Sequence, residues 1–411
     1  MDYFNYKQDE LFAEEVSLKD IAEQHGTPAY VYSRATLERH AKAYTDSFSA
    51  MSGLVCFSVK ALSNISILKV LKDCGCGFDI VSGGELHRAL LAGADPQKII
   101  FSGVGKSEVE MAAGINNGIL SFNIESKSEL MRLESVASSM QKIAPIAIRF
   151  NPGVDAGVHE FTKTGRKSDK FGVSIEDALE LAKHCIRSKN LQMVGLTCHI
   201  GSQITELQKF EEAAHQSLKM LCEVEALGAT LDFIDMGGGL GVTYVNEETI
   251  EPHELIQSYE TIFKGRSERL IVEPGRSISA NAGVMLAKVE YEKDAFLITD
   301  AAMNDLLRPA LYQAHHEVWQ VQKNSNMLQN YNVVGPICET GDFLAKNVSL
   351  SAGEGDLLAI RTVGAYGFVM SSNYNSRTRA PEILVDKDQF SLIRRREHLS
   401  DLTALEEGLD D

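Results

Sequence analysis

The sequence has little basic charge, few aromatic residues and few prolines. Its 411 residues carry 40 Lys and Arg against 57 Asp and Glu, a formal net charge of −17 at pH 7. A chain with this balance repels phosphate, so we expect neither nucleic acid nor a membrane surface as a partner. The 9 prolines and 32 glycines are too few for a low-complexity or fibrous protein. At roughly 150 residues per domain, the length predicts a multi-domain globular chain.

The N-terminus lacks a targeting signal, and cysteine is scarce. Residues 1–18 contain no basic start followed by an apolar run, and no later apolar stretch approaches the roughly 20 residues that span a bilayer. We therefore expect a cytoplasmic protein. The 7 cysteines are an odd number, which argues against a disulfide framework. Only Cys74 and Cys76 lie close together, and because no second Cys or His pair stands at ligand spacing, no metal site is predicted.

Short β-branched runs alternate with longer amphipathic stretches over the first two thirds of the chain, a pattern typical of parallel βα units. Eight strands are predicted, at Leu54–Val59, Gly77–Val81, Lys98–Ser102, Ile119–Asn123, Pro145–Phe150, Gln192–His199, Leu231–Met236 and Arg269–Glu273. Helices are predicted between them at Ile65–Lys72, Gly84–Ala92, Ser128–Met140, Ile175–Ser188 and Leu207–Leu227. Eight consecutive units match the size and count of a (β/α)8 barrel better than those of an open doubly wound sheet.

The pattern changes after about residue 280. Short segments separated by turn residues predict an antiparallel β domain, with strands at Val284–Tyr291, Ala295–Thr299, Tyr331–Val334, Asp356–Thr362 and Glu382–Val385. We therefore expect a barrel domain at residues 27–280 and a β domain at residues 281–411, which residues 1–26 join. The final residues, ALEEGLDD, are typical of an acidic helix or tail that frays.

Polar or glycine positions fall at the carboxyl ends of six predicted strands, where a barrel builds its pocket. They are Lys60, Asp79, Arg149, His199, Gly237–Gly239 and Glu273. Lys60 ends the apolar run LVCFSVKA, where its amine can act as a nucleophile toward an aldehyde or can simply extend to solvent. His199 lies in HIGSQ and can stack on a flat cofactor or pack as a core histidine, and Ser202 of the same motif can bind a phosphate.

Two glycine-containing motifs follow the last two predicted barrel strands. The run DMGGGLG at residues 235–241 lets backbone N–H groups approach an anion, although it lacks the ending of a Walker loop. In EPGR, Glu273 can accept a hydrogen bond from a ring N–H⁺, Gly275 allows a close backbone approach, and Arg276 can bind a carboxylate. Further along, CETGD at residues 338–342 places a thiol beside two acids, or else forms a simple surface turn.

Eleven motifs in order over nearly the whole chain carry a family resemblance: FSVKALSN, FDIVSGGEL, RFNPG, KFGV, HIGSQ, MGGGLG, EPGR, RPALYQAHH, CETGD, GAYG and YNSRTR. The chain resembles the diaminopimelate decarboxylases, pyridoxal-phosphate enzymes with an alanine-racemase-type barrel and a C-terminal β domain. The resemblance implies decarboxylation of meso-diaminopimelate to L-lysine and carbon dioxide, the last step of bacterial lysine biosynthesis. FSVKALSN departs mildly from relatives, which more often read Tyr-Ala-x-Lys-Ala-Asn, and the difference touches only the packing beside Lys60.

The resemblance also implies roles for individual residues. The catalytic residues would be Lys60, which holds pyridoxal 5'-phosphate as a Schiff base, His199, which stacks on its ring, Glu273, which binds the ring nitrogen, and Cys338, a proton donor from the second subunit. The cofactor shell would further comprise Asp79, Arg149, Ser202, Gly237, Gly238, Gly239, Gly275, Arg276 and Tyr366. The substrate would contact Arg276, Arg308, Tyr312, Glu339 and Tyr366. A proton donor from the second subunit implies a homodimer with shared active sites.

Three alternatives remain open from the residues alone. An amino-acid racemase on the same barrel needs two bases on opposite faces of the substrate carbon, whereas CETGD and the Arg308–Tyr312 segment favour decarboxylation. A decarboxylase of ornithine, lysine or arginine carries a similar Cys-Asp segment, whereas Glu339 and RPALYQAHH favour diaminopimelate. A non-catalytic pyridoxal-phosphate carrier would be expected to lack the lysine or the thiol, and both are present.

Overall fold

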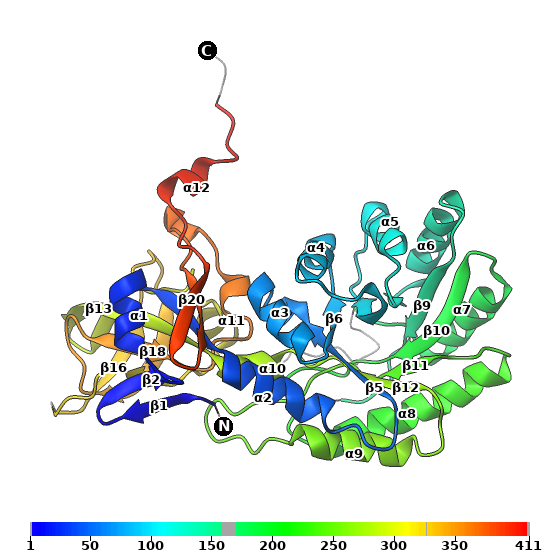
Figure 1. Cartoon of the computed structure of the whole chain (residues 1–411), viewed down its shortest axis with the longest axis horizontal. Coiled ribbons are helices and arrows are strands. Elements are labelled where there is room, and N and C mark those ends of the chain that lie inside the picture. The colour runs from blue at the N-terminus through cyan, green and yellow to red at the C-terminus, as the bar shows by residue number, and fades with distance from the viewer. Residues whose placement is uncertain (1, 156, 158–169, 326, 409–411) are drawn as a thin grey trace. The chain divides into compact units, whose positions relative to one another are not determined.

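The computed structural model describes residues 2–155, 157, 170–325 and 327–408, and the chain divides into two compact units (Figure 1). The barrel unit comprises residues 39–243 and 247–278, and the β unit comprises residues 1–38, 244–246 and 279–411. The barrel unit thus begins at Arg39 rather than at the expected residue 27. The reason is β4 (Ala29–Ser33), which pairs with two strands of the β unit.

Eight parallel strands close the barrel in the order β10-β11-β12-β5-β6-β7-β8-β9. They are β5 (Gly53–Ser58), β6 (Gly77–Ile80), β7 (Ile99–Phe101), β8 (Ser121–Ile124), β9 (Ala144–Arg149), β10 (Leu191–Thr197), β11 (Phe233–Asp235) and β12 (Arg269–Val272). Each corresponds to one of the predicted strands, so the predicted (β/α)8 barrel is confirmed. The strands are buried almost throughout because the barrel interior covers one face and the surrounding helices cover the other.

A helix follows each barrel strand, and α5 to α8 are among the cyan and green ribbons of Figure 1. These helices are α3 (Ile65–Asp73), α4 (Gly83–Leu91), α5 (Glu108–Asn117), α6 (Lys127–Ser139), α7 (Ile175–Arg187), α8 (Leu207–Ala226), α9 (Pro252–Ile262) and the short α10 (Arg276–Ser279), while α2 (Arg34–Thr45) precedes β5. Serine fixes where four of them begin: the side chains of Ser82, Ser107, Ser126 and Ser174 accept N–H groups of the first turns of α4 to α7.

Apolar side chains fill the interior of the barrel. Leu54, Cys56, Ile100, Phe233 and Ile271 belong to one buried cluster that draws on strands from all around the barrel. A filled interior leaves no room for a ligand inside the barrel, so a site must lie where the strands end.

The β unit is built around the long strand β13 (Gly283–Lys293), which pairs with β4, with β14 (Phe296–Thr299) and with β18 (Leu357–Ile360). The remaining strands are β15 (Val318–Gln320), β16 (Gln329–Val334), β17 (Phe343–Leu350), β19 (Glu382–Asp386) and β20 (Gln389–Arg394). The expectation of a purely antiparallel domain needs a correction, because β4 with β19 and β14 with β16 are parallel pairs. A parallel partner for β19 is possible because β4 comes from the far end of the chain rather than from a hairpin.

The N-terminal residues form a small sheet of their own in the β unit, with β1 (Phe4–Lys7), β2 (Glu10–Ala13) and β3 (Val16–Ser17), followed by α1 (Leu18–His25). Their apolar side chains share one buried cluster with those of β13 and β19. Near the other end of the chain lies the short helix α12 (Leu399–Thr403), and the last three residues of the predicted acidic tail are outside the described residues.

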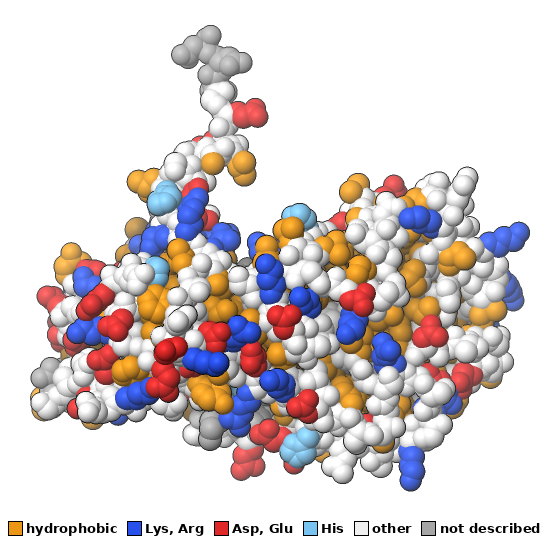
Figure 2. Space-filling model, viewed as in Figure 1, with side chains coloured by type: hydrophobic (Ala, Val, Ile, Leu, Met, Phe, Trp, Pro, Cys, Tyr) orange, Lys and Arg blue, Asp and Glu red, His pale blue; other side chains and the backbone are white. Residues whose placement is uncertain are grey.

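Within the part of the chain that the structure describes, every helix is too short or too polar to cross a bilayer. On the face drawn in Figure 2, basic and acidic side chains intermingle over the surface. Acidic and basic side chains are therefore mixed on this face rather than separated into patches of one sign.

Glu260 on α9 fastens the loop that leads into the first barrel strand. Its carboxylate accepts the N–H groups of Ser49, Ala50 and Met51 at 2.8–3.0 Å and the Ser49 hydroxyl at 2.9 Å. Burial raises the pKa of this carboxyl, but the hydrogen bonds outweigh burial and hold the pKa below its ordinary value.

We expect Glu260→Gln to lower the free energy of unfolding by about 1–3 kcal/mol at neutral pH, because it replaces the charged acceptor of three backbone N–H groups and a hydroxyl. Since the native pKa lies below that of the unfolded chain, the wild-type advantage is full above the ordinary glutamate pKa and is lost as the pH falls through the native value. Urea unfolding of both proteins over a pH series measures this. Glu223→Gln, at a surface pair 3.8 Å from Lys219, is the control and should change stability by less than about 0.5 kcal/mol. An advantage that does not depend on pH would contradict the assignment.

Candidate active site

Four of the predicted residues line one small cavity at the carboxyl ends of the barrel strands. Lys60 follows β5, Arg149 ends β9, His199 follows β10 and Glu273 follows β12. The cavity measures about 30 Å³, and Ser102, Asn123 and Thr197 complete its lining. The barrel closure thus brings together side chains that stand far apart in the sequence.

Lys60 is held by an ion pair with Asp79 of β6. The Nζ to Oδ2 distance is 2.7 Å, and the Asp79 side chain is fully buried while that of Lys60 is 39% exposed. Ser58 donates its hydroxyl to the same carboxylate oxygen at 2.9 Å. The lysine is therefore anchored on one side and accessible on the other, as a residue that bonds to an incoming aldehyde must be.

Three carboxyl groups, those of Asp79, Asp235 and Glu273, are buried at this rim. Burial raises the pKa of Glu273 well above its ordinary value, and the neighbouring Asp235 and Asp79 raise it further. Burial also raises the pKa of Asp235 to about 6. Glu273 Oε1 is buried and has no hydrogen-bond partner among the described residues. A ligand that donates a hydrogen bond there would satisfy it.

His199 is a neutral ring in this site. Burial lowers its pKa well below the ordinary histidine value, and the positive charges of Arg149 and Lys60 lower it further. Its Nδ1 accepts the N–H of Gly238 at 3.2 Å, so the ring proton is assigned to Nε2. An uncharged imidazole can stack on a flat aromatic ring without bringing another cation beside Lys60.

The glycine run after β11 packs against the ends of the neighbouring strands. A Cβ atom on Gly238 would lie 2.1 Å from the carbonyl oxygen of Glu273. Gly237 has φ +66° and Gly239 has φ +112°, conformations that favour glycine. The run was predicted as an anion-binding loop, and its glycines are also required simply for the loop to fit beside β12.

Arg276 and Ser202 meet next to this loop. The guanidinium donates to the Ser202 hydroxyl oxygen from Nη2 at 3.1 Å and from Nε at 3.4 Å. Gly275 packs on the end of β5, where an added Cβ would lie 3.0 Å from Ser58 Cβ. The HIGSQ and EPGR motifs thus adjoin each other and place a cation and a hydroxyl where a phosphate can bind.

Arg149 is fixed by Glu125, the residue that follows β8. Its Nη1 donates to both carboxylate oxygens of Glu125 at 3.1 Å, and both side chains are nearly buried. Glu125 also accepts the N–H groups of Gly103 at 2.9 Å and Gly172 at 3.1 Å. One carboxylate therefore ties three loops of the rim to the arginine.

The predicted residues of the β unit form a separate group. Arg308 opens α11 (Arg308–Tyr312) and donates from Nη1 to Tyr244 Oη at 2.9 Å, with His316 Nε2 at 3.1 Å. Tyr312 is half-buried at the end of the same helix. Tyr366 lies in GAYG with φ +58°, a rare conformation for a tyrosine.

The CETGD loop of the β unit leaves its thiol accessible. Cys338 is exposed, and its N–H donates to Asn375 Oδ1 at 3.3 Å. Tyr374 donates its hydroxyl to the carboxylate of Glu339, so YNSRTR supports this loop. Asp342 is buried and accepts the N–H groups of Met303 and Ile337 at 2.7 and 2.8 Å. Of the two acids, one therefore shapes the loop and the other is on the surface.

Sequence reasoning missed several residues of the rim. Ser102, Asn123 and Thr197 line the cavity, and Asn123 donates to Ser102 Oγ at 3.0 Å while its own Oδ1 is buried without a partner among the described residues. A signal was present: each is a polar residue near the end of an otherwise apolar strand.

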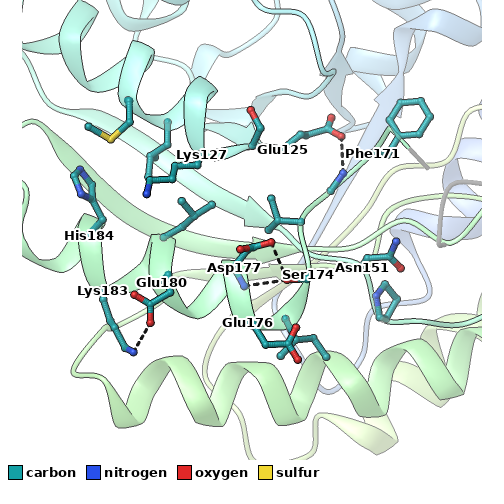
Figure 3. A pocket seen from close by; sticks show the side chains of 18 of the residues that line it. Glu125, Lys127, Asn151, Phe171, Ser174, Glu176, Asp177, Glu180, Lys183 and His184 are labelled. Atoms are coloured by element: carbon teal, nitrogen blue, oxygen red, sulfur yellow. Dashed lines mark hydrogen bonds and ion pairs between the residues drawn. The ribbon is translucent and has the colours of Figure 1, made fainter. Parts of the chain in front are cut away.

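A larger cavity, of about 1170 Å³, lies between α6 and α7 (Figure 3). Charged residues of both signs line it, among them Lys127, Glu180, Lys183 and Asp177, and Glu180 pairs with Lys183 at 2.7 Å. No residue that the sequence singled out for the site lines it. Glu125 borders this cavity and binds Arg149 of the inner rim at the same time.

A comparison with protein families defines the class of the barrel. The family described as pyridoxal-dependent decarboxylase, pyridoxal binding domain, matches residues 34–280. This match covers the complete barrel and all of its rim.

Comparisons with individual proteins narrow the class. The chain is 50% identical to a diaminopimelate decarboxylase of Pseudomonas fluorescens over the full length of both. The diaminopimelate decarboxylase of Helicobacter pylori, solved with L-lysine, has a TM-score of 0.92 and 41% identity, covering 94% of this chain and 98% of that one. The M. jannaschii enzyme, also solved with L-lysine, has a TM-score of 0.94 and 33% identity over 99% and 98%. The chain belongs to the diaminopimelate decarboxylase family of pyridoxal-dependent decarboxylases.

The rim fits pyridoxal phosphate, the cofactor of this family. The buried Glu273 Oε1 lacks a donor that a ring N–H⁺ can supply, and the accessible Lys60 amine matches an aldehyde. Ser202, Arg276 and the glycine run supply hydroxyl, guanidinium and backbone groups for a phosphate.

We expect Glu125→Ala to destabilise the cofactor-free protein by about 3–5 kcal/mol, because it leaves the Arg149 guanidinium buried without its counter-charge. The double variant Glu125→Ala/Arg149→Met should recover part of this loss, since it removes the unpaired charge. Urea unfolding of the two variants and of the wild type measures the difference. A double variant no more stable than Glu125→Ala would show that Glu125 acts through the loop N–H groups of Gly103 and Gly172 rather than through Arg149.

Proposed function

We propose that the chain catalyses the pyridoxal-phosphate-dependent decarboxylation of meso-diaminopimelate to L-lysine and carbon dioxide, the last step of lysine biosynthesis. The observation that carries this proposal is the 50% identity to a diaminopimelate decarboxylase over the full length of both chains. The complexes of two further relatives with L-lysine agree with it, because lysine is the product of this reaction.

In this proposal the barrel residues bind and orient the cofactor, which supplies an electron sink for the carbanion that remains when carbon dioxide leaves. Lys60 holds the aldehyde carbon, His199 packs on the ring and Glu273 binds the ring nitrogen. Asp79 anchors Lys60, and Arg149 adds positive charge to the rim. The phosphate is assigned to Ser202, Gly237, Gly238, Gly239, Gly275, Arg276 and Tyr366.

The residues of the β unit, together with Arg276, are assigned to the substrate. Diaminopimelate carries a carboxylate and an ammonium group at its distal end. The site therefore needs cationic side chains for the carboxylates and an anionic side chain for the ammonium group. Arg308 and Arg276 suit the carboxylates, Glu339 suits the ammonium group, and Tyr312 and Tyr366 can complete the contacts by hydrogen bonding. Binding the distal end of the substrate determines which bond at the reacting carbon stands perpendicular to the ring. In this proposal these contacts determine the substrate specificity.

The rival reactions differ in substrate or in the fate of the carbanion. A racemase returns a proton to the same carbon without losing carbon dioxide, and a decarboxylase of lysine, ornithine or arginine needs no group for a distal carboxylate. We expect purified protein to release carbon dioxide from meso-diaminopimelate far faster than from L-lysine, L-ornithine or L-arginine. Release from another of these substrates at an equal rate would overturn the substrate assignment.

Lys60→Ala should abolish the visible absorbance of bound pyridoxal phosphate and lower turnover of meso-diaminopimelate by about 10²–10⁴-fold or more, because the residue that bonds to the cofactor is gone. Absorbance spectra and carbon dioxide release measure the two effects. Lys183→Ala is the matched control, since Lys183 also pairs with a carboxylate at 2.7 Å but lies outside the rim. Attachment of the cofactor to another lysine after borohydride reduction would contradict the role of Lys60.

We further propose a homodimer in which Cys338 of the partner subunit donates the proton that replaces carbon dioxide. Its support is the division of the assigned residues between two units, with the lysine in one and an exposed thiol in the other. A location in the cytoplasm is part of this proposal, because all seven cysteines are free thiols.

Subunit mixing tests the shared site. Lys60→Ala and Cys338→Ala proteins should each be inactive alone, and on exchange of subunits their activity should rise toward about one quarter of wild type. Random pairing makes half of the dimers mixed, and each mixed dimer has one intact site of two. Native mass spectrometry shows that the subunits have exchanged. Carbon dioxide release from the exchanged mixture then measures the recovery of activity. No recovery despite exchange would mean that Lys60 and Cys338 act within one chain.

A further inference from the structure

Asp235, the last residue of β11, is buried behind the rim and has no role in the assignments above. Its side chain is fully buried and does not line the cavity. Its Oδ1 accepts the N–H of Gly237 at 2.8 Å, and its Oδ2 accepts the hydroxyl of Thr197 at 3.2 Å. It also shares a side-chain hydrogen bond with Glu273. One carboxyl group therefore connects the first glycine of the phosphate loop with the carboxyl assigned to the ring nitrogen.

A hydrogen bond between two carboxyl groups requires a proton, and the surroundings decide which group carries it. Asp235 accepts two other donors, which stabilise it as the anion. Glu273 has no such donor on Oε1, and its pKa is raised well above its ordinary value by burial and by the charges of Asp235 and Asp79. In the cofactor-free protein the proton therefore resides on Glu273, which donates it to Asp235.

The other charged and titratable groups around the pair come from every element that packs against it. They are Asp79 of β6, Lys60 after β5, Cys56 of β5, Cys198 after β10 and Tyr259 of α9, with Arg149 and His199 on the same cavity. Lys60 and Asp79 neutralise each other in an ion pair. Burial raises the pKa of Cys198 to about 12 and that of Cys56 well above its ordinary value, so both thiols are uncharged at neutral pH. Among the described residues, Asp235 therefore remains as the neighbouring negative charge that raises the pKa of Glu273 most.

We propose that Asp235 is a positioning residue for Glu273: it turns the second carboxyl oxygen of Glu273 toward the cavity and keeps a proton on Glu273 until a ring nitrogen arrives. The inference rests on the proposed function, since it takes the ring nitrogen of pyridoxal phosphate as the group that Glu273 meets. In this inference Asp235 does not contact the cofactor, yet its carboxyl group affects the protonation of the ring nitrogen through Glu273.

The proton balance of the step is simple. The proton leaves the Glu273 carboxyl and binds the lone pair of the ring nitrogen, which becomes N–H⁺. Glu273 becomes a carboxylate and accepts the hydrogen bond of that N–H⁺. Asp235 remains an anion, held by Gly237 and Thr197, and no other bond changes. The proton on the ring nitrogen thus comes from a group of the protein.

Infrared difference spectroscopy of the cofactor-free protein tests the proposal without any activity measurement. The wild type should show the C=O stretch of a protonated, buried carboxylic acid at neutral pH, and Glu273→Gln should lose that band. The band should persist to a pH well above the ordinary glutamate pKa. Absence of a protonated carboxyl group at neutral pH in the wild type, or its persistence in Glu273→Gln, would overturn the proposal.

Asp235→Asn should ionise Glu273, because it removes the neighbouring negative charge and offers an amide N–H to the carboxylate. The midpoint pH of the band should fall by about one unit or more. Thr197→Val is the matched control, since it removes one donor to Asp235 and keeps the charge, and it should retain the band at neutral pH. An unchanged midpoint in Asp235→Asn would mean that Asp235 only supports the glycine loop.

The two proposals fail in distinguishable ways. If the band behaves as expected but the protein does not decarboxylate meso-diaminopimelate, the substrate assignment falls and the carboxyl pair stands. If Asp235→Asn fails to fold, the comparison of wild type with Glu273→Gln still decides where the proton lies. With pyridoxal phosphate bound, Asp235→Asn should lower kcat while leaving KM for substrate nearly unchanged, because the ring charge acts on the chemical step.

Discussion

The packing of three acidic side chains around one lysine is the constraint on which the rest of the barrel rim depends. Asp79, Asp235 and Glu273 are all buried where the strands end, and among the described residues Lys60 is the cation that forms an ion pair with one of them, Asp79. Burying an isolated charge is expensive, so each acid needs a partner, a donor or a proton. Asp79 has the lysine and Ser58, Asp235 has two donors, and Glu273 has the proton that we propose for it. The chemistry attributed to this rim follows from that distribution.

The same constraint explains why the motifs are so short and so rich in glycine. To bring donors onto Asp235, the chain after β11 must turn back at once, and Gly237 does this with φ +66° while its N–H points at the carboxylate. To lie beside Glu273, the next residue must have no side chain, since Gly238 meets the Glu273 carbonyl. The glycine motif that resembles a phosphate-binding loop is thus also required for the closely packed strand ends to fit together.

The barrel could be predicted from the sequence because each strand is a short apolar run bounded by polar residues. Its rim followed from the rule that strand ends converge, which is why Lys60, His199 and Glu273 could be placed together in advance. The role of Asp235 could not be predicted in this way, because its partners Thr197 and Glu273 lie on neighbouring strands and only the register of the barrel brings them within hydrogen-bonding distance. The strand β4 was not predicted for the same reason. Its partners lie hundreds of residues further along the chain, and nothing in its local sequence indicates them. A short buried strand also gives only a weak local signal.

The place of β4 has a consequence for the order in which the chain folds during synthesis. This strand leaves the ribosome before any barrel strand, yet it lies between β13 and β19, which are made after the whole barrel. Its backbone groups therefore stay without strand partners until the barrel sequence has been translated, while every strand pair of the barrel is available earlier. Domains fold as units as they emerge, so the barrel is the first unit able to close, and the N-terminal segment waits in the nascent chain for the last hundred or so residues to reach it.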